Sequence, residues 1–244
     1  MALTKKDFAI LDEFRFDVQP LGVKLLARRP DSLDRLSRNM ALCEMLKTAQ
    51  EGEVFYADAQ NHNCDAGLYV LGQTEGKEQF LNGEYGAGLR VFSDTRSASR
   101  LYHYISRIPR DVVNYVAFSP LNRLPFEPDV LVILANINQA EVLLRATTYE
   151  TGKTWSSRYS AAIGCSWLLA YPYLTGEVNY VTTGLGFGMK RRKLFPEGLQ
   201  LISVPFDHLH SLLQTLREMP WVPPPYEPDG LEYVKQLKTR LGIT

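Results

Sequence analysis

The feature that most constrains the fold is a pattern that occurs twice in the second half of the chain. The tetrapeptide Val-Asn-Tyr-Val stands at 113–116 and again at 178–181. After each copy come a loop, an apolar run typical of a strand, and an amphipathic helix, which predicts two strand–strand–helix units, at 113–149 and 178–219. One such unit cannot bury both of its faces, so the two units are expected to share one sheet. The alternative is chance, because apolar strands followed by amphipathic helices resemble each other anyway.

The run from Asp129 to Ala135 is apolar almost throughout, as expected for a central strand that is buried on both faces. The predicted fold class is therefore α+β: a mixed sheet that contains the duplicated unit, with helices packed on it. Residues 1–219 are expected to form a single domain. Residues 220–244 are expected to form a proline-rich arm and a C-terminal helix. An arm of this kind could wrap a partner subunit, so a homodimer is a further expectation.

Outside the duplicated units, apolar spacing and terminating residues predict the remaining elements. A loose, glycine-rich segment at 73–88 reads as a mobile loop. The helix at 160–171 is expected to end because Pro172 cannot continue it. The other expected elements are a helix at 4–14 capped by Thr4, a strand at 21–26, a helix at 40–50, a strand at 54–56, a short helix at 64–71 and a helix at 93–106.

Composition excludes several classes of protein. The 244 residues carry 27 Lys and Arg against 27 Asp and Glu. Zero net charge argues against broad electrostatic capture of nucleic acid or of an acidic membrane. The polar N-terminal residues do not resemble a signal peptide, and no stretch approaches the roughly 20 apolar residues of a membrane span. Three widely spaced cysteines suit a reducing compartment, so a cytoplasmic location is expected.

A glycine-rich loop follows the second tetrapeptide and offers a first candidate site. Gly184, Gly186 and Gly188 could let backbone N–H groups approach an anion, and Arg191 and its basic neighbours would supply charge. Arg123 stands in the equivalent loop of the first unit. This loop matches neither dinucleotide nor P-loop fingerprints, and a strand rather than a helix is expected to follow it. The alternative is a glycine-rich hairpin with a solvated basic tip.

The cysteines offer a second candidate site. Cys43, Cys64 and Cys165 could hold an iron–sulfur cluster with an open position, and together with His62 they could hold zinc. Spacing this wide does not by itself define a metal site. The alternative is that each cysteine is a small buried hydrophobe.

Several stretches together resemble an uncharacterised family of archaea and bacteria called ArCR, catalogued as domain of unknown function 169. The resemblance covers roughly residues 8–217 and implies that the three cysteine positions belong to the family pattern. In relatives, the segment matching 184–191 often holds another cysteine, whereas this chain has Gly186 and Phe187 there, which leaves three cysteines and an open position or His62. The stretches that carry the resemblance are Pro20–Leu26, Cys43 with Ala49 and Gly52-Glu53, Cys64-Asp65-Ala66-Gly67 with Leu71-Gly72, Pro128-Asp129-Val130, Ala140–Tyr149 with Gly152, and Gly164-Cys165.

The family brings no activity with it, so the functional expectation rests on the residues. The first hypothesis is a cofactor-binding or redox protein that holds an iron–sulfur cluster or a metal through its three cysteines. The alternative is a non-enzymatic module that binds or senses a small anionic ligand without metal, in a cleft where the two units meet and with 73–88 as a lid. A third hypothesis is an interaction role for the proline-rich arm.

Overall fold

The structure, a computed structural model, describes residue 3 and residues 5–243. A single six-stranded sheet runs through the molecule in the order β2-β3-β1-β4-β6-β5. The expected α+β class is confirmed, but every pair of named strands is antiparallel, so the sheet is not mixed. The strands are β1 (Leu21–Leu26), β2 (Phe55–Asp58), β3 (Tyr115–Pro120), β4 (Val130–Ala135), β5 (Asn179–Thr182) and β6 (Gln200–Pro205).

The helices lie close to the predicted positions, and none within residues 5–243 is both long and apolar enough to cross a membrane. The proposed cap Thr4 lies outside the described residues. The helices are α1 (Lys5–Phe8), η1 (Ala9–Phe14), α2 (Leu42–Gln50), η2 (Ala59–Asn61), α3 (Asp65–Val70), α4 (Glu78–Leu81), α5 (Glu84–Gly88), α6 (Thr95–Tyr104), η3 (Leu121–Arg123), α7 (Ile137–Thr148), the π-helical η4 (Ser166–Ala170), α8 (Tyr171–Thr175), α9 (Phe187–Arg192), α10 (Phe206–Glu218), η5 (Pro224–Tyr226) and α11 (Gly230–Leu241).

Strand β4 divides the core into two halves. Its residues are buried without exception, and because successive side chains alternate between faces, Val130, Val132 and Leu134 join one hydrophobic cluster. Leu131 and Ile133 join the other cluster. The continuous apolar run is therefore explained by a strand covered on both sides.

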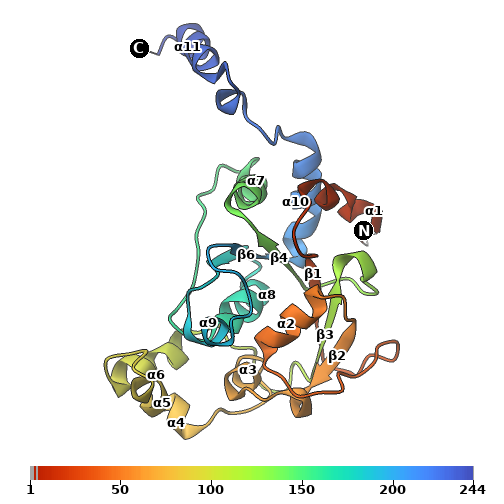
Figure 1. Cartoon of the computed structure of the whole chain (residues 1–244), viewed down its shortest axis with the longest axis vertical. Coiled ribbons are helices and arrows are strands. Elements are labelled where there is room, and N and C mark those ends of the chain that lie inside the picture. The colour runs from red at the N-terminus through yellow and green to blue at the C-terminus, as the bar shows by residue number, and fades with distance from the viewer. Residues whose placement is uncertain (1–2, 4, 244) are drawn as a thin grey trace.

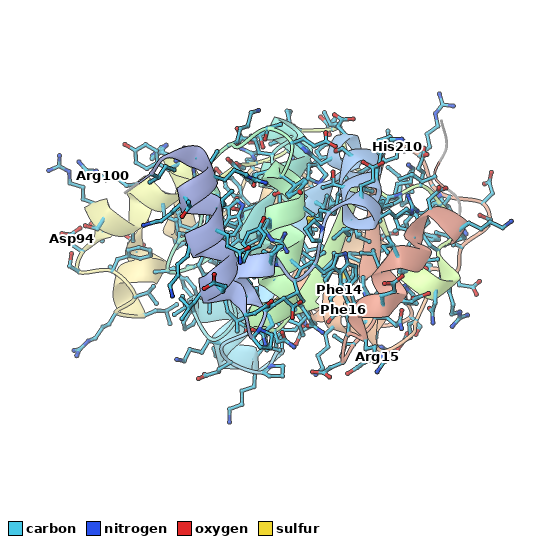
Figure 2. All side chains as sticks on the ribbon, turned by 90° about the horizontal axis from the view of Figure 1, so that it is seen from above. Phe14, Arg15, Phe16, Asp94, Arg100 and His210 are labelled. Carbon is cyan, nitrogen blue, oxygen red and sulfur yellow. The ribbon has the colours of Figure 1, made fainter. Side chains whose placement is uncertain are left out.

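One face of the sheet is covered closely by α7, α10 and η1, which pack against one another and against β4 and β6. Phe14 at the end of η1 stacks on Phe16 with ring centroids 5.1 Å apart, and both are labelled in Figure 2. We call this side the α7/α10 face.

The other face is covered by α2, α3 and the segment from η4 to α8. Pro172 does not end this helical segment, contrary to expectation. The chain passes from a π-helical turn into α8, and Pro172 occupies the first turn of α8, where a missing N–H is tolerated.

Residues 78–104 fold as the three helices α4, α5 and α6, so most of the segment 73–88, which was expected to be a mobile loop, is helical. Glycine content misled the prediction, since Gly83 (φ +87°) precedes α5 and Gly86 packs within it against Ala98. These helices form a cluster away from the sheet, at the lower left of Figure 1. Asp94 and Arg100 mark the outer end of this cluster in Figure 2. We call residues 78–104 the helical cap.

The two predicted units correspond only in part. Ile133 and Ile202, which are equivalent in the sequence pattern, are direct cross-strand partners in β4 and β6, and the helices that follow, α7 and α10, pack side by side. The first strands differ, because β5 pairs directly with β6 whereas β1 separates β3 from β4. Duplication of the whole unit stays a prediction.

The arm leaves the domain at Pro220 and Trp221. Arg145 of α7 donates hydrogen bonds to both of their carbonyl oxygens, and the Trp221 ring lies 4.3 Å from that of Phe14. Beyond this anchor, α11 packs against η5 and stands apart from the body at the top of Figure 1.

Candidate functional site

All three cysteines line one cavity of about 270 Å³ between the sheet-covering helices and the helical cap. Cys43 lies in the first turn of α2, Cys64 directly precedes α3, and Cys165 lies next to η4. Fewer than one residue in ten lines this cavity, yet all three cysteines do. Chance placement of small buried hydrophobes does not readily produce that convergence.

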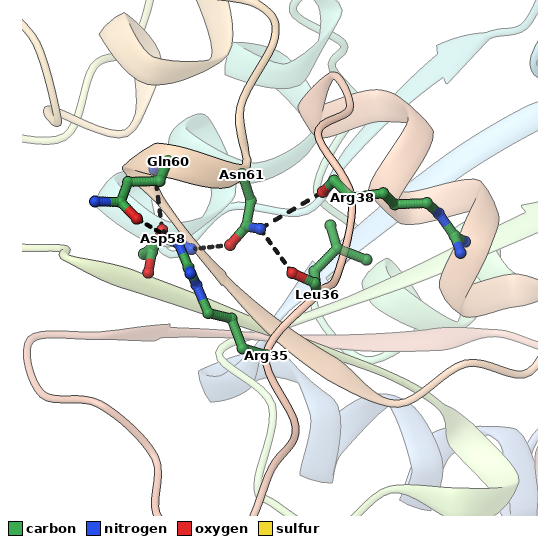
Figure 3. Close-up of polar contacts among 6 residues, drawn as sticks. All are labelled: Arg35, Leu36, Arg38, Asp58, Gln60 and Asn61. Carbon is green, nitrogen blue, oxygen red and sulfur yellow. Dashed lines mark hydrogen bonds and ion pairs between the residues drawn. The ribbon is translucent and has the colours of Figure 1, made fainter.

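Backbone pairing brings Cys64 beside Cys43. Met40 donates its N–H to the carbonyl of Asn61, and Asn63 donates its N–H to the carbonyl of Met40, so the turn before Cys64 runs along the residues that lead into α2. The Asn61 amide in turn donates to the carbonyl of Leu36, as Figure 3 shows. These bonds fix two cysteine-bearing segments that are distant in sequence against each other.

The same figure shows the polar network that holds this turn from the outside. Arg35 contacts Asp58 at 2.8 Å and Gln60 at 2.9 Å, and the Asp58 carboxylate accepts the N–H of Gln60. The backbone N–H of Asp58 donates a hydrogen bond to the side-chain oxygen of Asn61. Because these groups share hydrogen bonds, the turn is held by several interactions at once.

Helix α9 closes another side of the cavity. Phe187 at its start donates its N–H to the carbonyl of Ala161, close to Cys165, and Arg192 at its end lies 3.7 Å from Glu44 of α2. Arg191 lines the cavity, and the described residues offer it no ion pair or hydrogen bond. The site therefore combines thiols with a free guanidinium.

Burial decides the protonation of the inner thiols. It raises the pKa of Cys43 to about 12, an effect that Arg192 opposes and that the Cys64 and Glu44 charges reinforce. It also raises the pKa of Cys165 well above its ordinary value, with repulsion from the other two cysteines adding to the shift. Mutual repulsion means that three thiolates could coexist only if a cation lay among them.

A single metal ion does not fit the described site. Zinc–thiolate bonds of about 2.3 Å require ligand sulfurs within about 4 Å of one another. Among residue 3 and residues 5–243, no group of three or more His, Cys, Asp or Glu side chains is arranged in that way. An iron–sulfur cluster places its thiolates on separate iron atoms, so its ligand sulfurs lie farther apart than those around one ion, and soft cysteine sulfurs are the donors it takes.

Other predicted site residues lie elsewhere. His62 is buried but does not line the cavity. Burial lowers the pKa of His62 to about 4, which keeps the ring neutral, and neither ring nitrogen has a hydrogen-bond partner among the residues that the structure describes. Arg123 donates a hydrogen bond to the carbonyl of Gly52, which lies just past the C-terminal end of α2. Cys43 is in the first turn of α2, so Gly52 lies about 13 Å from it along the helix axis. Neither residue lines the cavity of the three cysteines.

The glycine-rich loop is divided between two places. Gly188 lines the cavity that the three cysteines line, whereas Gly184 lines a separate hollow beside β5 together with Lys190. Gly186 (φ +76°) immediately precedes α9, and a Cβ there would clash with the Tyr159 hydroxyl. A short helix, rather than the expected strand, therefore follows this loop directly.

Sequence reasoning assigned no site role to the aromatic residues of the helical cap. Phe80, Tyr85 and Tyr102 line the cavity, and the Phe80 ring contacts both tyrosine rings, with centroids 4.6 Å apart for Phe80 and Tyr85. The large aromatic residues within this glycine-rich segment could have indicated their role. Side chains of this kind are usually well buried, which is unexpected in a solvated loop.

The fold and cavity together define a class of protein: an α+β domain with a thiol-lined internal site. The chain belongs to the family described as uncharacterised ArCR, whose profile matches residues 9–215, so the resemblance expected from the sequence is confirmed. It is similar over 213 residues to the "Uncharacterized protein MJ0308" of Methanocaldococcus jannaschii, with 24% identity across 85% of this chain and 90% of that protein. No solved structure matches the chain.

Proposed function

We propose that this chain is a cofactor-binding protein that holds an iron–sulfur cluster through Cys43, Cys64 and Cys165. The observation that carries the proposal is the convergence of all three cysteines on one cavity from three separate segments. Bound there, a cluster with an open position would supply electron transfer or Lewis-acid chemistry. We place the protein in the cytoplasm, where thiols remain reduced.

The arrangement of the chain's own residues supports this assignment. Cys64 is only partly buried, so the site can be loaded from solvent, whereas Cys43 and Cys165 are each 8% exposed. Arg192 lies near Cys43 and favours its thiolate. The surrounding walls are largely apolar, which would limit access of water to a bound cluster.

The test is to measure iron, zinc and acid-labile sulfide per chain in protein purified without oxygen. We expect iron and sulfide in the native chain, loss of both in Cys64→Ala, and retention in His62→Gln, because His62 lies outside the cavity. Native protein that stays free of iron and sulfide even after reconstitution with both would overturn the proposal. Zinc bound in place of iron, and lost in Cys64→Ala, would instead identify a single-ion site.

The second candidate is a module that binds a small anionic ligand without metal. Arg191 favours it, since a guanidinium that lines a cavity without a partner is a ready anion site. If this candidate is correct, the cysteines serve as wall residues and Cys64→Ala keeps the ligand affinity of the native chain.

A further inference from the structure

Besides the thiols, three polar side chains that line the cavity have no hydrogen-bond or ion-pair partner among the described residues. They are the Arg191 guanidinium, which belongs to a solvent-exposed residue, and the hydroxyls of Tyr102 and Tyr85. The other charged side chains that line the cavity are paired: Asp65 lies 2.8 Å from Lys77, and Arg192 lies 3.7 Å from Glu44. The cavity thus has one unpaired positive charge and two free phenol hydroxyls, of which that of Tyr102 belongs to the more buried residue.

Desolvation supports the role of the hydroxyl. Burial, followed by nearby Tyr85, Cys64 and Tyr69, raises the pKa of Tyr102, so the phenol stays protonated. A protonated phenol in a partly dry site donates a hydrogen bond to an anion at little cost. A guanidinium and a phenol both donate hydrogen bonds that carboxylate oxygens accept.

The size and walls of the cavity restrict the rest of the ligand. A dry apolar cavity of about 150 Å³ is large enough for benzene. At about 270 Å³, this cavity has room for one ring and a short polar tail. The ring would lie against Phe80, Phe92 and Leu89 of the helical cap, which are apolar and partly exposed to the cavity.

We propose that this cavity binds a small carboxylate that carries one aromatic ring, with the carboxylate at Arg191 and Tyr102 and the ring against the helical cap. A single negative charge is balanced by the single free guanidinium, whereas a phosphate dianion would leave charge uncompensated between apolar walls. This inference rests on the proposed function in one respect, namely that the three-cysteine cavity is the functional site.

The experiment titrates phenylacetate into the full chain, purified without oxygen, by isothermal calorimetry. Phenyl phosphate and inorganic phosphate are the comparison probes. We expect phenylacetate to bind more tightly than either. Arg191→Gln should weaken phenylacetate binding about 10- to 100-fold, as loss of a charge-assisted hydrogen bond does, and Tyr102→Phe should weaken it several-fold.

Lys190→Gln is the matched control, because Lys190 neighbours Arg191 in sequence but lines the separate hollow beside β5. Its phenylacetate affinity should equal that of the native chain. No binding of phenylacetate at millimolar concentration, or equal affinity in Arg191→Gln with an unchanged melting temperature, would overturn the inference. Tighter binding of phenyl phosphate would do so as well.

Iron and sulfide are measured on the same preparations, so failure of the cluster proposal and failure of the ligand proposal can be told apart. Phenylacetate binding to protein that stays free of iron and sulfide even after reconstitution would support the ligand and overturn the cluster. Bound iron and sulfide without phenylacetate binding would leave the cluster and overturn the ligand.

Discussion

The two faces of the sheet are covered in different ways. On the α7/α10 face, helices that follow β4 and β6 directly in the chain lie flat on the strands, and Leu143, Leu209 and Leu212 are at most 1% exposed. On the opposite face α2, α3 and the segment from η4 to α8 form the first layer, and the helical cap rests on that layer and not on the sheet. The cavity lies where the second layer meets the first.

The difference separates a closely packed face from a face that keeps a hollow. Helices adjacent to their own strands in the chain bury apolar surface with short connections and leave no gap. A cap made of three short helices, the longest of them α6 (Thr95–Tyr104), cannot present a continuous apolar stripe, and its aromatic side chains fill only part of the space. Three cysteines and two arginines line the remaining hollow.

The largest expected effect tests directly whether the two faces differ in packing. Leu212→Ala on the α7/α10 face should reduce the free energy of unfolding by about 2–5 kcal/mol, because a buried leucine leaves a void in a close-packed layer. Leu89→Ala in the helical cap should cost less than about 1 kcal/mol, since Leu89 is 39% exposed and already faces a cavity. Urea denaturation measures both. Equal losses would mean that the cap and the α7/α10 face are equally well packed.

A second effect concerns acid stability on the cysteine-bearing side. His62 is held neutral by burial, with its pKa lowered from 6.5 to about 4. The folded state therefore binds fewer protons than the unfolded chain in this range, so stability is complete above pH 6.5 and is lost as pH falls through about 4. The gap between the two values corresponds to roughly 3 kcal/mol.

Denaturation midpoints measured from pH 7 to pH 4 check this expectation. His62→Gln should flatten the decline over that range. His210→Gln is the control, because His210 is exposed on α10 of the other face, as labelled in Figure 2. A His62→Gln profile that keeps the slope of the native chain would show that another group drives acid unfolding.

The smallest effect concerns the arm, which belongs to neither face. Removing residues 222–244 should change the free energy of unfolding by less than about 0.5 kcal/mol, because α11 packs against η5 and not against the domain. Trp221→Ala should cost more, since Trp221 contacts Phe14 and donates to the carbonyl of Leu216.

Thermal unfolding and sedimentation equilibrium test the arm together. If the truncated chain is much less stable, α11 docks on the domain or on a second copy in solution. Loss of a dimer on truncation would support the homodimer expected from the proline-rich arm.

Much of the fold was predictable because local rules decided it. The apolar run at 129–135 predicted a central strand, and periodic spacing predicted α7 and α10, where propensity, pattern and tertiary packing agree. The insertion of β1 between β3 and β4 was not predictable from such rules, because strand order depends on pairings between residues far apart in sequence.

For the candidate site, the sequence predicted the types of residue involved but not their arrangement in space. The three cysteines and Arg191 were identified by residue type, and the structure brings them to one cavity. His62 was proposed because it stands two positions from Cys64, but the pairing of Met40 with Asn61 and Asn63 turns the chain so that its ring is buried elsewhere. Proximity in sequence does not fix the direction of a side chain within a turn.

The position of β1 has a consequence for synthesis. Leu21 pairs with Pro120 and Val132, so β1 leaves the ribosome about a hundred residues before either partner. At about 5–20 residues per second, its edges stay unpaired for several seconds or longer. The contiguous stretch from β4 to α10 can assemble once it is complete, and β1 must be kept from other chains until β3 and β4 emerge. We therefore expect chaperone contacts on the nascent chain to concentrate on the first 26 residues.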